Sequence, residues 1–204
     1  MAGTCWQCQI WSFTVFDDTG HGQSTWATQG VYDAANQGAK VINFSGTFSA
    51  AYTPFYDAVN YAATQTGTGA ITIVAAGNDN TSNPVYPGAY DNLISVASVD
   101  HNANRASDSN YGWWVDLAAG GVQDVVADLF TGSYTSMSGT SFATSVVSGI
   151  AALDWTIDQS RNGVFNDLEQ YSNKNDYPQG NGITNYGYVN ARCGVSHIVT
   201  ANCH

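Results

Sequence analysis

The sequence predicts an α/β fold, a three-layer sandwich in which a mostly parallel, doubly wound sheet lies between two layers of helices. Three observations predict it. Short runs that are apolar throughout alternate along the chain with longer runs of helical periodicity. The last helical run, residues 140–157, is mostly apolar and rich in small residues that permit close packing. A length of 204 residues with 44% hydrophobic residues suits one domain, residues 1–204.

The first half of the chain alternates strand-like and helix-like runs. Residues 9–16, QIWSFTVF, predict a strand that ends at the turn signal DDTG. A helix is expected over residues 24–39, where apolar residues recur at helical spacing. Residues 40–45, KVINFS, form a short β-branched run and predict a buried strand. A second helix is expected over residues 49–67.

The second half continues the alternation. Residues 70–78, AITIVAAGN, predict a buried strand that ends at a Gly-Asn turn, and residues 92–100 predict another. Short extended segments are expected within residues 115–129, before the helix at 140–157. Reactive residues in such sheets collect at the carboxyl ends of the strands. The loops after the strands are therefore the places to look for chemistry.

The charge balance limits the classes of partner. The chain has 16 acidic and 5 basic residues and a formal net charge of −11. Phosphate binding is driven by Lys and Arg, so nucleic acid and anionic membrane surfaces are excluded as expected partners. No signal peptide or membrane-spanning run is visible. The composition, rich in small polar residues, indicates a secreted or extracellular surface protein.

Four cysteines lie at the two ends of the chain, at Cys5, Cys8, Cys193 and Cys203. The pair in CWQC has CxxC spacing, but neither a redox helix nor a second metal-binding pair accompanies it. Disulfides are expected, with three pairings left open. They would favour an oxidising compartment.

Two polar residues stand at positions where catalysis is plausible. Ser141 follows Gly-Thr at the first turn of the long helix, where local N–H groups and the helix dipole favour an oxyanion. The alternative is an N-cap serine. Asn78 ends the strand in VAAGN, where its amide can donate to a developing negative charge. Its alternative is a turn-forming asparagine.

Taken together, these motifs resemble those of the subtilisin-like serine peptidases. That family has a nucleophile motif G-T-S-x-A-[TS] and an oxyanion-hole motif A-A-G-N. This chain has GTSFAT and AAGN, and 63 residues lead from Asn78 to Ser141. KVINFS, YPGAYDNLISVASVD, VDLAAGG and GYVNARCGV are similar to further motifs of the family, in the same order. The resemblance covers residues 9–195.

The resemblance implies a role for each matching residue. Ser141 would be the nucleophile and Asn78 the oxyanion donor. Asp116 lies where some relatives have a calcium ligand, so calcium is possible, but one carboxylate is too little to assign a metal or any other cofactor. The walls of the substrate pocket would be formed by Ser45, Gly46 and Thr47 on one side and by Ala75, Ala76 and Gly77 on the other.

The family's triad Asp and His have no counterpart at the expected spacing. DDTGHGQS, residues 17–24, contains an Asp and a His, but the family separates its Asp and His motifs much more widely. The distance between DDTGHGQS and KVINFS is instead similar to that between the family's substrate-binding loop and its matching strand. Gly20, His21 and Gly22 would then be an extended stretch that pairs with substrate by β-augmentation. The Asp and His segments, and the strand that carries the Asp, would lie before Met1, so that the fold is N-terminally truncated.

Three functions follow from this pattern. The favoured one is a subtilisin-like peptidase domain that is inactive as this chain alone and serves as an extracellular structural or binding subunit. Two proline positions of the family, occupied here by Gly120 and Ser145, support it. The alternative is a serine endopeptidase completed by a separate N-terminal segment. The third is a self-contained hydrolase that uses His21 or His101 as its base.

The expected partner is a polypeptide substrate or a complementary chain segment. In the family the Asp-bearing strand lies between the strands that match residues 9–16 and 40–45. Those two strands would here pair directly, or another chain would fill the gap, because an open slot leaves backbone groups unpaired. Strand complementation between copies would give a homo-oligomer.

Overall fold

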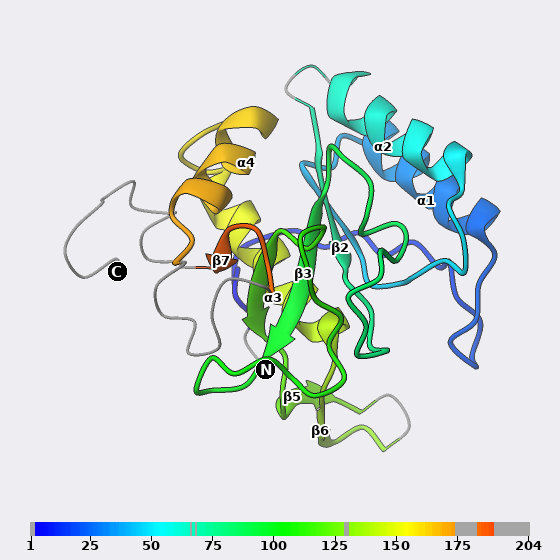
Figure 1. The fold of residues 1–204 in the computed structure, drawn as a ribbon. Coiled ribbons are helices and arrows are strands. Elements are labelled where there is room, and N and C mark those ends of the chain that lie inside the picture. Colours follow the sequence, from blue (N-terminus) through cyan, green and yellow to red (C-terminus); the bar gives the residue numbers. More distant parts are fainter. Residues whose placement is uncertain (1–2, 66, 68, 129–130, 174–182, 190–204) are drawn as a thin grey trace.

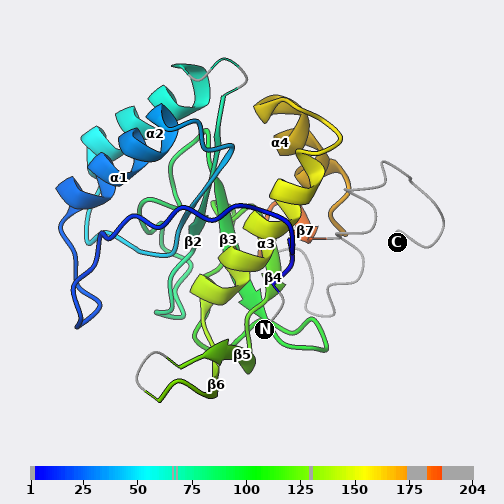
Figure 2. The same ribbon diagram turned by 180° about the vertical axis from the view of Figure 1, so that it is seen from behind.

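A computed structural model describes residues 3–65, 67, 69–128, 131–173 and 183–189. Helices cover both faces of a parallel sheet, which confirms the predicted three-layer α/β fold (Figures 1 and 2). One face carries α1 (Ser24–Asn36) and α2 (Thr53–Gln65), and the other carries α3 (Thr140–Asp154) and α4 (Arg161–Gln170). The sheet contains β1 (Val41–Phe44), β2 (Ile71–Ala75), β3 (Ile94–Val99), β4 (Leu117–Gly120) and β7 (Gly187–Tyr188).

The strands of the sheet follow the order β1-β2-β3-β4-β7, and all four neighbouring pairs are parallel. Successive side chains of a strand point to opposite faces. In β2, Ile71 and Ile73 pack in the cluster beneath α3 and α4, whereas Val74 packs in the cluster with α1 and α2. Burial on both faces explains why these strands are apolar throughout.

The remaining pair of strands forms a separate antiparallel hairpin of β5 (Asp124–Ala127) and β6 (Tyr134–Met137). This hairpin leads from the carboxyl end of β4 to the start of α3. It projects from the sheet near the N-terminal end of α3 (Figure 2). Of these elements, the sequence predicted neither β6 nor α4 nor β7.

The predicted strand over residues 9–16 is wrong, because this segment has no strand partner. β1 pairs with β2 on one side, and within the described residues no strand pairs with its other side. Residues 9–16 do not pair with β1, and no backbone hydrogen bond joins them to another residue that the structure describes. Phe13 and Val15 instead pack against the cluster around α1 and α2. An apolar run becomes a strand only where a neighbour accepts its ladder hydrogen bonds.

The first cysteine pair forms a disulfide, Cys5–Cys8. Cys193 and Cys203 lie outside the described residues. Next to the disulfide, Thr4 packs against α3, where a β-carbon on Gly149 would lie 2.6 Å from Thr4 Cβ. A glycine in the helix therefore allows the N-terminal segment to approach its backbone. No helix within the described residues is long and apolar enough to cross a membrane.

Candidate active site

The N-terminus of α3 meets the carboxyl ends of three strands. Gly139, the residue before α3, donates its N–H to the Gly121 carbonyl just after β4, at 2.8 Å. Its φ of 149° is one that other residues rarely adopt. The next residue, Thr140, contacts the end of β2, and Ser141 contacts the end of β1. The sheet therefore brings the predicted nucleophile to the predicted edge.

Ser141 is held by reciprocal hydrogen bonds with Ser45. Ser141 Oγ donates to the Ser45 carbonyl at 3.2 Å, and Ser45 Oγ donates to the Ser141 carbonyl at 3.2 Å. Ser145 Oγ donates to the same Ser141 carbonyl at 3.0 Å, one helical turn away. The side chain of Ser141 is partly exposed. Its hydroxyl is accessible, but its acceptor is a carbonyl oxygen, which cannot take a proton as a base does.

Asn78 is fixed by Thr140, the residue before Ser141. Asn78 Oδ1 accepts hydrogen bonds from Thr140 N at 2.9 Å and from Thr140 Oγ1 at 3.0 Å. Thr140 Oγ1 also accepts the Gly77 N–H at 3.1 Å. The Thr140 side chain is fully buried. One hydroxyl therefore joins the end of β2 to the start of α3 and sets the orientation of the Asn78 amide.

This orientation leaves two donors free beside Ser141. Asn78 uses its oxygen for Thr140, and within the described part of the chain its Nδ2 group has no acceptor. The Ser141 N–H, at the start of α3, also has no hydrogen-bond acceptor among the described residues. A side-chain amide and a helix N-terminal N–H are the kinds of donor that stabilise an oxyanion. The arrangement can therefore stabilise negative charge on a carbonyl attacked by Ser141.

Asn110 braces the loop that carries Asn78, a role that no local pattern in the sequence revealed. Its buried Oδ1 accepts the N–H groups of Asp79 and Thr81, at 3.0 and 3.1 Å. Its Nδ2 donates to the Ala76 carbonyl at 2.8 Å. A β-carbon on Gly77, where φ is 101°, would lie 2.5 Å from the same Nδ2. A glycine is thus required at residue 77.

The two predicted walls of the substrate pocket lie together. Ala75 and Ala76 are buried at the end of β2, and a β-carbon on Gly77 would lie 3.3 Å from Thr47 Cγ2 on the other wall. A β-carbon on Gly46 would lie 2.7 Å from the Phe16 and Phe44 rings.

Phe16 links these walls to the predicted substrate loop. A β-carbon on Gly22 would lie 3.1 Å from Phe16 Cδ1, so the same ring contacts Gly22 and Gly46. The ring also stacks on Phe44, with centroids 5.9 Å apart. This linking ring was missed in the sequence, where Phe16 is only the last residue of an apolar run.

The loop of Gly20, His21 and Gly22 closes on itself through Asp17. Asp17 donates its N–H to the His21 carbonyl at 2.7 Å, and its Oδ1 accepts the His21 N–H at 3.0 Å. Gly20 donates its N–H to the Asp17 carbonyl at 3.0 Å. Hydrogen bonds from Thr19 and His21 lower the pKa of the Asp17 carboxyl. Among the described residues, the Gly20 carbonyl and the backbone N–H and C=O of Gly22 have no hydrogen-bond partner.

Neither described histidine is positioned as a base for Ser141. His21 Nδ1 lies 2.9 Å from Thr19 Oγ1, and His101 Nε2 lies 3.0 Å from the Asn102 amide nitrogen. Ser141 Oγ contacts no imidazole within the residues that the structure describes. His197 and His204 lie outside them.

The Asp116 carboxylate accepts hydrogen bonds from Ser95. Its Oδ2 accepts hydrogen bonds from Ser95 N at 2.8 Å and from Ser95 Oγ at 3.0 Å. Burial raises the pKa of Asp116 to about 6, in spite of these hydrogen bonds. Over the described ranges, no group of three or more His, Cys, Asp or Glu side chains is placed to hold a metal ion. The carboxylate is explained by its role in joining β3 to the start of β4.

Comparison with known proteins gives one consistent result. The sequence profile of the subtilase family (Peptidase_S8) matches residues 1–178. Thermitase of Thermoactinomyces vulgaris is 41% identical over 153 residues, which are 75% of this chain and 53% of that protein. Subtilisin BL of Lederbergia lenta is 34% identical over 190 residues, covering 90% of this chain and 68% of that protein.

Solved structures agree with the sequence matches. A cold-adapted subtilisin-like serine proteinase superimposes with a TM-score of 0.77 at 30% identity, over 86% of this chain and 65% of that one. The prenylagaramide maturation protease PagA gives a TM-score of 0.78 at 25% identity, over 90% and 70% of the two chains. The chain spans 53% of thermitase and 39% of a thermophilic serine proteinase of Bacillus sp. (strain AK1), to which it is 38% identical.

Proposed function

Because this chain belongs to the subtilase family, we propose that it is a serine peptidase domain that is inactive by itself and serves as an extracellular polypeptide-binding subunit. In this proposal Ser141 occupies the nucleophile position and Asn78 the oxyanion position. The walls formed by Ser45–Thr47 and Ala75–Gly77 and the loop Gly20–Gly22 contact the bound polypeptide.

One observation carries the proposal of inactivity. The Ser141 hydroxyl donates to the Ser45 carbonyl, and no described imidazole is within hydrogen-bond reach. A serine hydroxyl is a poor nucleophile until a base removes its proton, and the base must be oriented by a third group. Without the base, transfer of an acyl group to Ser141 is slower by several orders of magnitude.

Peptide hydrolysis by the purified chain tests this proposal. The substrate is a chromogenic peptide anilide, and the matched control is Ser141→Ala, which removes only the hydroxyl. We expect the chain and the Ser141→Ala variant to release the aniline at the same background rate. A rate for the unsubstituted chain that clearly exceeds that of the variant would contradict the proposal.

A second function, a serine endopeptidase completed by a separate segment, is favoured by the hydrogen bonds around Thr140. The buried Thr140 hydroxyl orients Asn78, and neither the Asn78 Nδ2 group nor the Ser141 N–H has an acceptor among the described residues. Such donors contribute to catalysis only if a base removes the proton of the serine hydroxyl and so activates it as a nucleophile. In this second function, a polypeptide that carries an Asp and a His would dock beside Ser141 and supply that base.

Complementation distinguishes the two functions. The assay adds a recombinant segment carrying the family's D-[ST]-G and H-G-T-x-V-A-G motifs to the purified chain and measures hydrolysis again. The same segment with Ala for its His is the control. Activity that requires Ser141 and that His would establish the second function. Binding without activity would support the first.

Assembly is a further part of the first proposal. β1 has an edge with no paired strand in the described residues, and an open edge can accept a strand from another chain. We propose a homo-oligomer formed by strand complementation between copies of one domain, residues 1–204. Light scattering coupled to size exclusion should give a defined oligomer, and a monomer at all concentrations would contradict it.

The Cys5–Cys8 disulfide supports a secreted location.

A further inference from the structure

The side chain of Thr47 reaches from one wall of the substrate pocket to the other. Thr47 ends the first wall, Ser45–Thr47, and is exposed, whereas Gly77 ends the second wall, Ala75–Gly77, and is buried. A β-carbon on Gly77 would lie 3.3 Å from Thr47 Cγ2. Because a carbon–carbon bond is about 1.5 Å long, this methyl group is at most about 4.8 Å from Gly77 Cα. The methyl group of one wall therefore lies against the backbone of the other.

This contact leaves no room for a long side chain between the walls. A group inserted between two surfaces makes a van der Waals contact on each side. Carbon atoms in contact are about 3.5–4.0 Å apart, so an inserted methylene group needs about 7–8 Å between the carbon atoms that flank it. The distance between Thr47 Cγ2 and Gly77 Cα is well below that value. The pocket is therefore shallow, and its depth is limited by Thr47.

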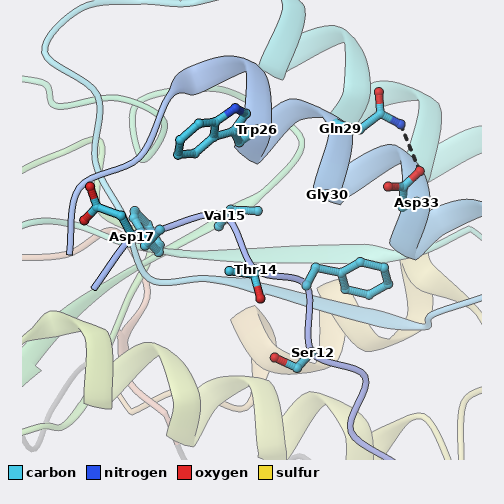
Figure 3. Close-up of a pocket in the computed structure, with 10 residues that line it drawn as sticks. Ser12, Thr14, Val15, Asp17, Trp26, Gln29, Gly30 and Asp33 are labelled. Carbon is cyan, nitrogen blue, oxygen red and sulfur yellow. Dashed lines mark hydrogen bonds between the residues drawn. The ribbon is translucent and has the colours of Figure 1, made fainter. Parts of the chain in front are cut away.

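The first wall has aromatic rings directly behind it. A β-carbon on Gly46 would lie 2.7 Å from the rings of Phe16 and Phe44. Phe16 also lines a groove of about 660 Å³ between residues 12–17 and α1 (Figure 3). No residue of either wall lines that groove, so it is not part of the pocket. The two rings fix the position of Gly46, next to Thr47.

Hydrogen bonds hold both walls beside the contact. Phe48, directly after Thr47, donates its N–H to the Tyr86 carbonyl at 2.6 Å. On the second wall, Gly77 donates its N–H to Thr140 Oγ1 at 3.1 Å. The side chain of Thr47 is also β-branched, and such side chains are restricted in their χ1 angle. The walls therefore cannot separate, nor can the methyl group turn aside, without the loss of these interactions.

The position of the pocket determines which residue of a bound polypeptide enters it. Ser141 Oγ donates to the carbonyl of Ser45 in the first wall, and Asn78 directly follows Gly77 of the second wall. A carbonyl group that faces both Ser141 and Asn78 is thus at the mouth of the pocket. The side chain of the residue that carries this carbonyl points between the walls.

From this geometry we infer that Thr47 determines the specificity of the site, which binds polypeptides that place Gly or Ala between the walls. The inference rests on the proposed function, because the polypeptide must bind at these walls. A hydrogen atom or one methyl group fits above the Thr47 methyl group. A larger side chain would overpack the pocket, which is unfavourable.

Fluorescence anisotropy tests the inference with two fluorescein-labelled hexapeptides, Thr-Val-Thr-Ala-Val-Thr and Thr-Val-Thr-Phe-Val-Thr, each with an amidated C-terminus. The residues that the two peptides share are β-branched, so only the fourth residue of the first peptide is small enough for the pocket. The alanine peptide should bind the chain at least about tenfold more tightly than the phenylalanine peptide.

Three substitutions of Thr47 test its role. Thr47→Gly removes the side chain, so the phenylalanine peptide should gain affinity by at least about tenfold. Thr47→Ser removes only the methyl group and should change the affinity in the same direction. Thr47→Val is the matched control, because it keeps the methyl group and the shape of the side chain. It should leave the ratio of the two affinities unchanged within about twofold. Circular dichroism checks that each variant is folded.

The assay distinguishes failure of the inference from failure of the proposed function. Equal binding of the two peptides to the unsubstituted chain would overturn the inference alone. An unchanged preference in both Thr47→Gly and Thr47→Ser, or a lost preference in Thr47→Val, would do the same. If no peptide bound to the chain or to any variant at millimolar concentration, the polypeptide-binding function would be contradicted, and the inference with it.

Discussion

Replacing Thr140 by Val should weaken the junction between β2 and α3 while preserving the volume of the side chain. The change removes the hydroxyl that accepts the Gly77 N–H and donates to Asn78 Oδ1. Gly77 N–H is then left buried without a partner, which costs about 1–3 kcal/mol, and the lost hydrogen bond to Asn78 adds about 1 kcal/mol. The free energy of unfolding should therefore fall by about 2–4 kcal/mol.

Urea unfolding, followed by circular dichroism, measures this difference. Thr64→Val is the matched control, because Thr64 Oγ1 donates to the Asn60 carbonyl on an exposed part of α2. It should change the free energy of unfolding by less than about 0.5 kcal/mol. Thr140→Ser keeps the hydroxyl and should lose only about 1 kcal/mol with its methyl group. If Thr140→Val were no more destabilising than Thr64→Val, the bonding assigned to Thr140 would be refuted.

Three further predictions concern the surroundings of the site. Asn110→Ala removes the hydrogen bonds that brace the Asn78 loop and should lower the free energy of unfolding by about 3 kcal/mol in a urea titration. Asn102→Ala, at an exposed position, should change it by less than about 0.5 kcal/mol. Equal effects would contradict the bracing role of Asn110. Both Gly77→Ala and Gly38→Ala introduce a side chain at positive φ, but only at residue 77 would the new β-carbon also meet a close neighbour. The melting temperature of Gly77→Ala should therefore fall further than that of Gly38→Ala, and equal shifts would refute the close approach. Burial raises the pKa of Asp116 from 3.8 to about 6, so the folded chain binds this proton more tightly than the unfolded chain. The free energy of unfolding should therefore fall by up to about 3 kcal/mol as pH rises through that interval. Asp116→Asn should remove this decrease, and an unchanged pH profile in that variant would contradict the prediction.

The sequence predicted the elements that depend mainly on their own residues. The strands at residues 70–78 and 92–100 were expected from continuous apolar runs, and β2 and β3 lie within those bounds, buried on both faces. The helix expected at residues 140–157 is α3, which ends at Asp154. Its apolar composition fits its position against four strands of the sheet.

Elements that depend on a partner were not predictable in the same way. Residues 9–16 have the composition of a strand, yet no described strand pairs with them. α4 has few apolar residues to mark it, although Ser160 caps it by accepting the Gly163 N–H. β7 has two residues, too few for any periodic pattern. In each case the deciding contact lies far away in the sequence or comes from a single residue.

The same distinction applies to the site. Ser141 and Asn78 were predicted as site residues because they lie within sequence motifs. In the structure, Asn78 is hydrogen-bonded to Thr140, the residue before Ser141. Asn110 lies outside those motifs, 32 positions after Asn78, so its bracing role became visible only in the folded chain. Phe16 could not be assigned either, because its role depends on the approach of Gly22 and Gly46.

Covalent labelling of Ser141 tests the central claim most directly. The purified chain is incubated with a fluorophosphonate probe, and intact-mass and peptide mass spectrometry then measure adduct formation at Ser141. Because Ser141 Oγ donates to a carbonyl and has no described imidazole in reach, the chain alone should form no adduct beyond the background of Ser141→Ala. Stoichiometric labelling of Ser141 in the chain alone would contradict the claim.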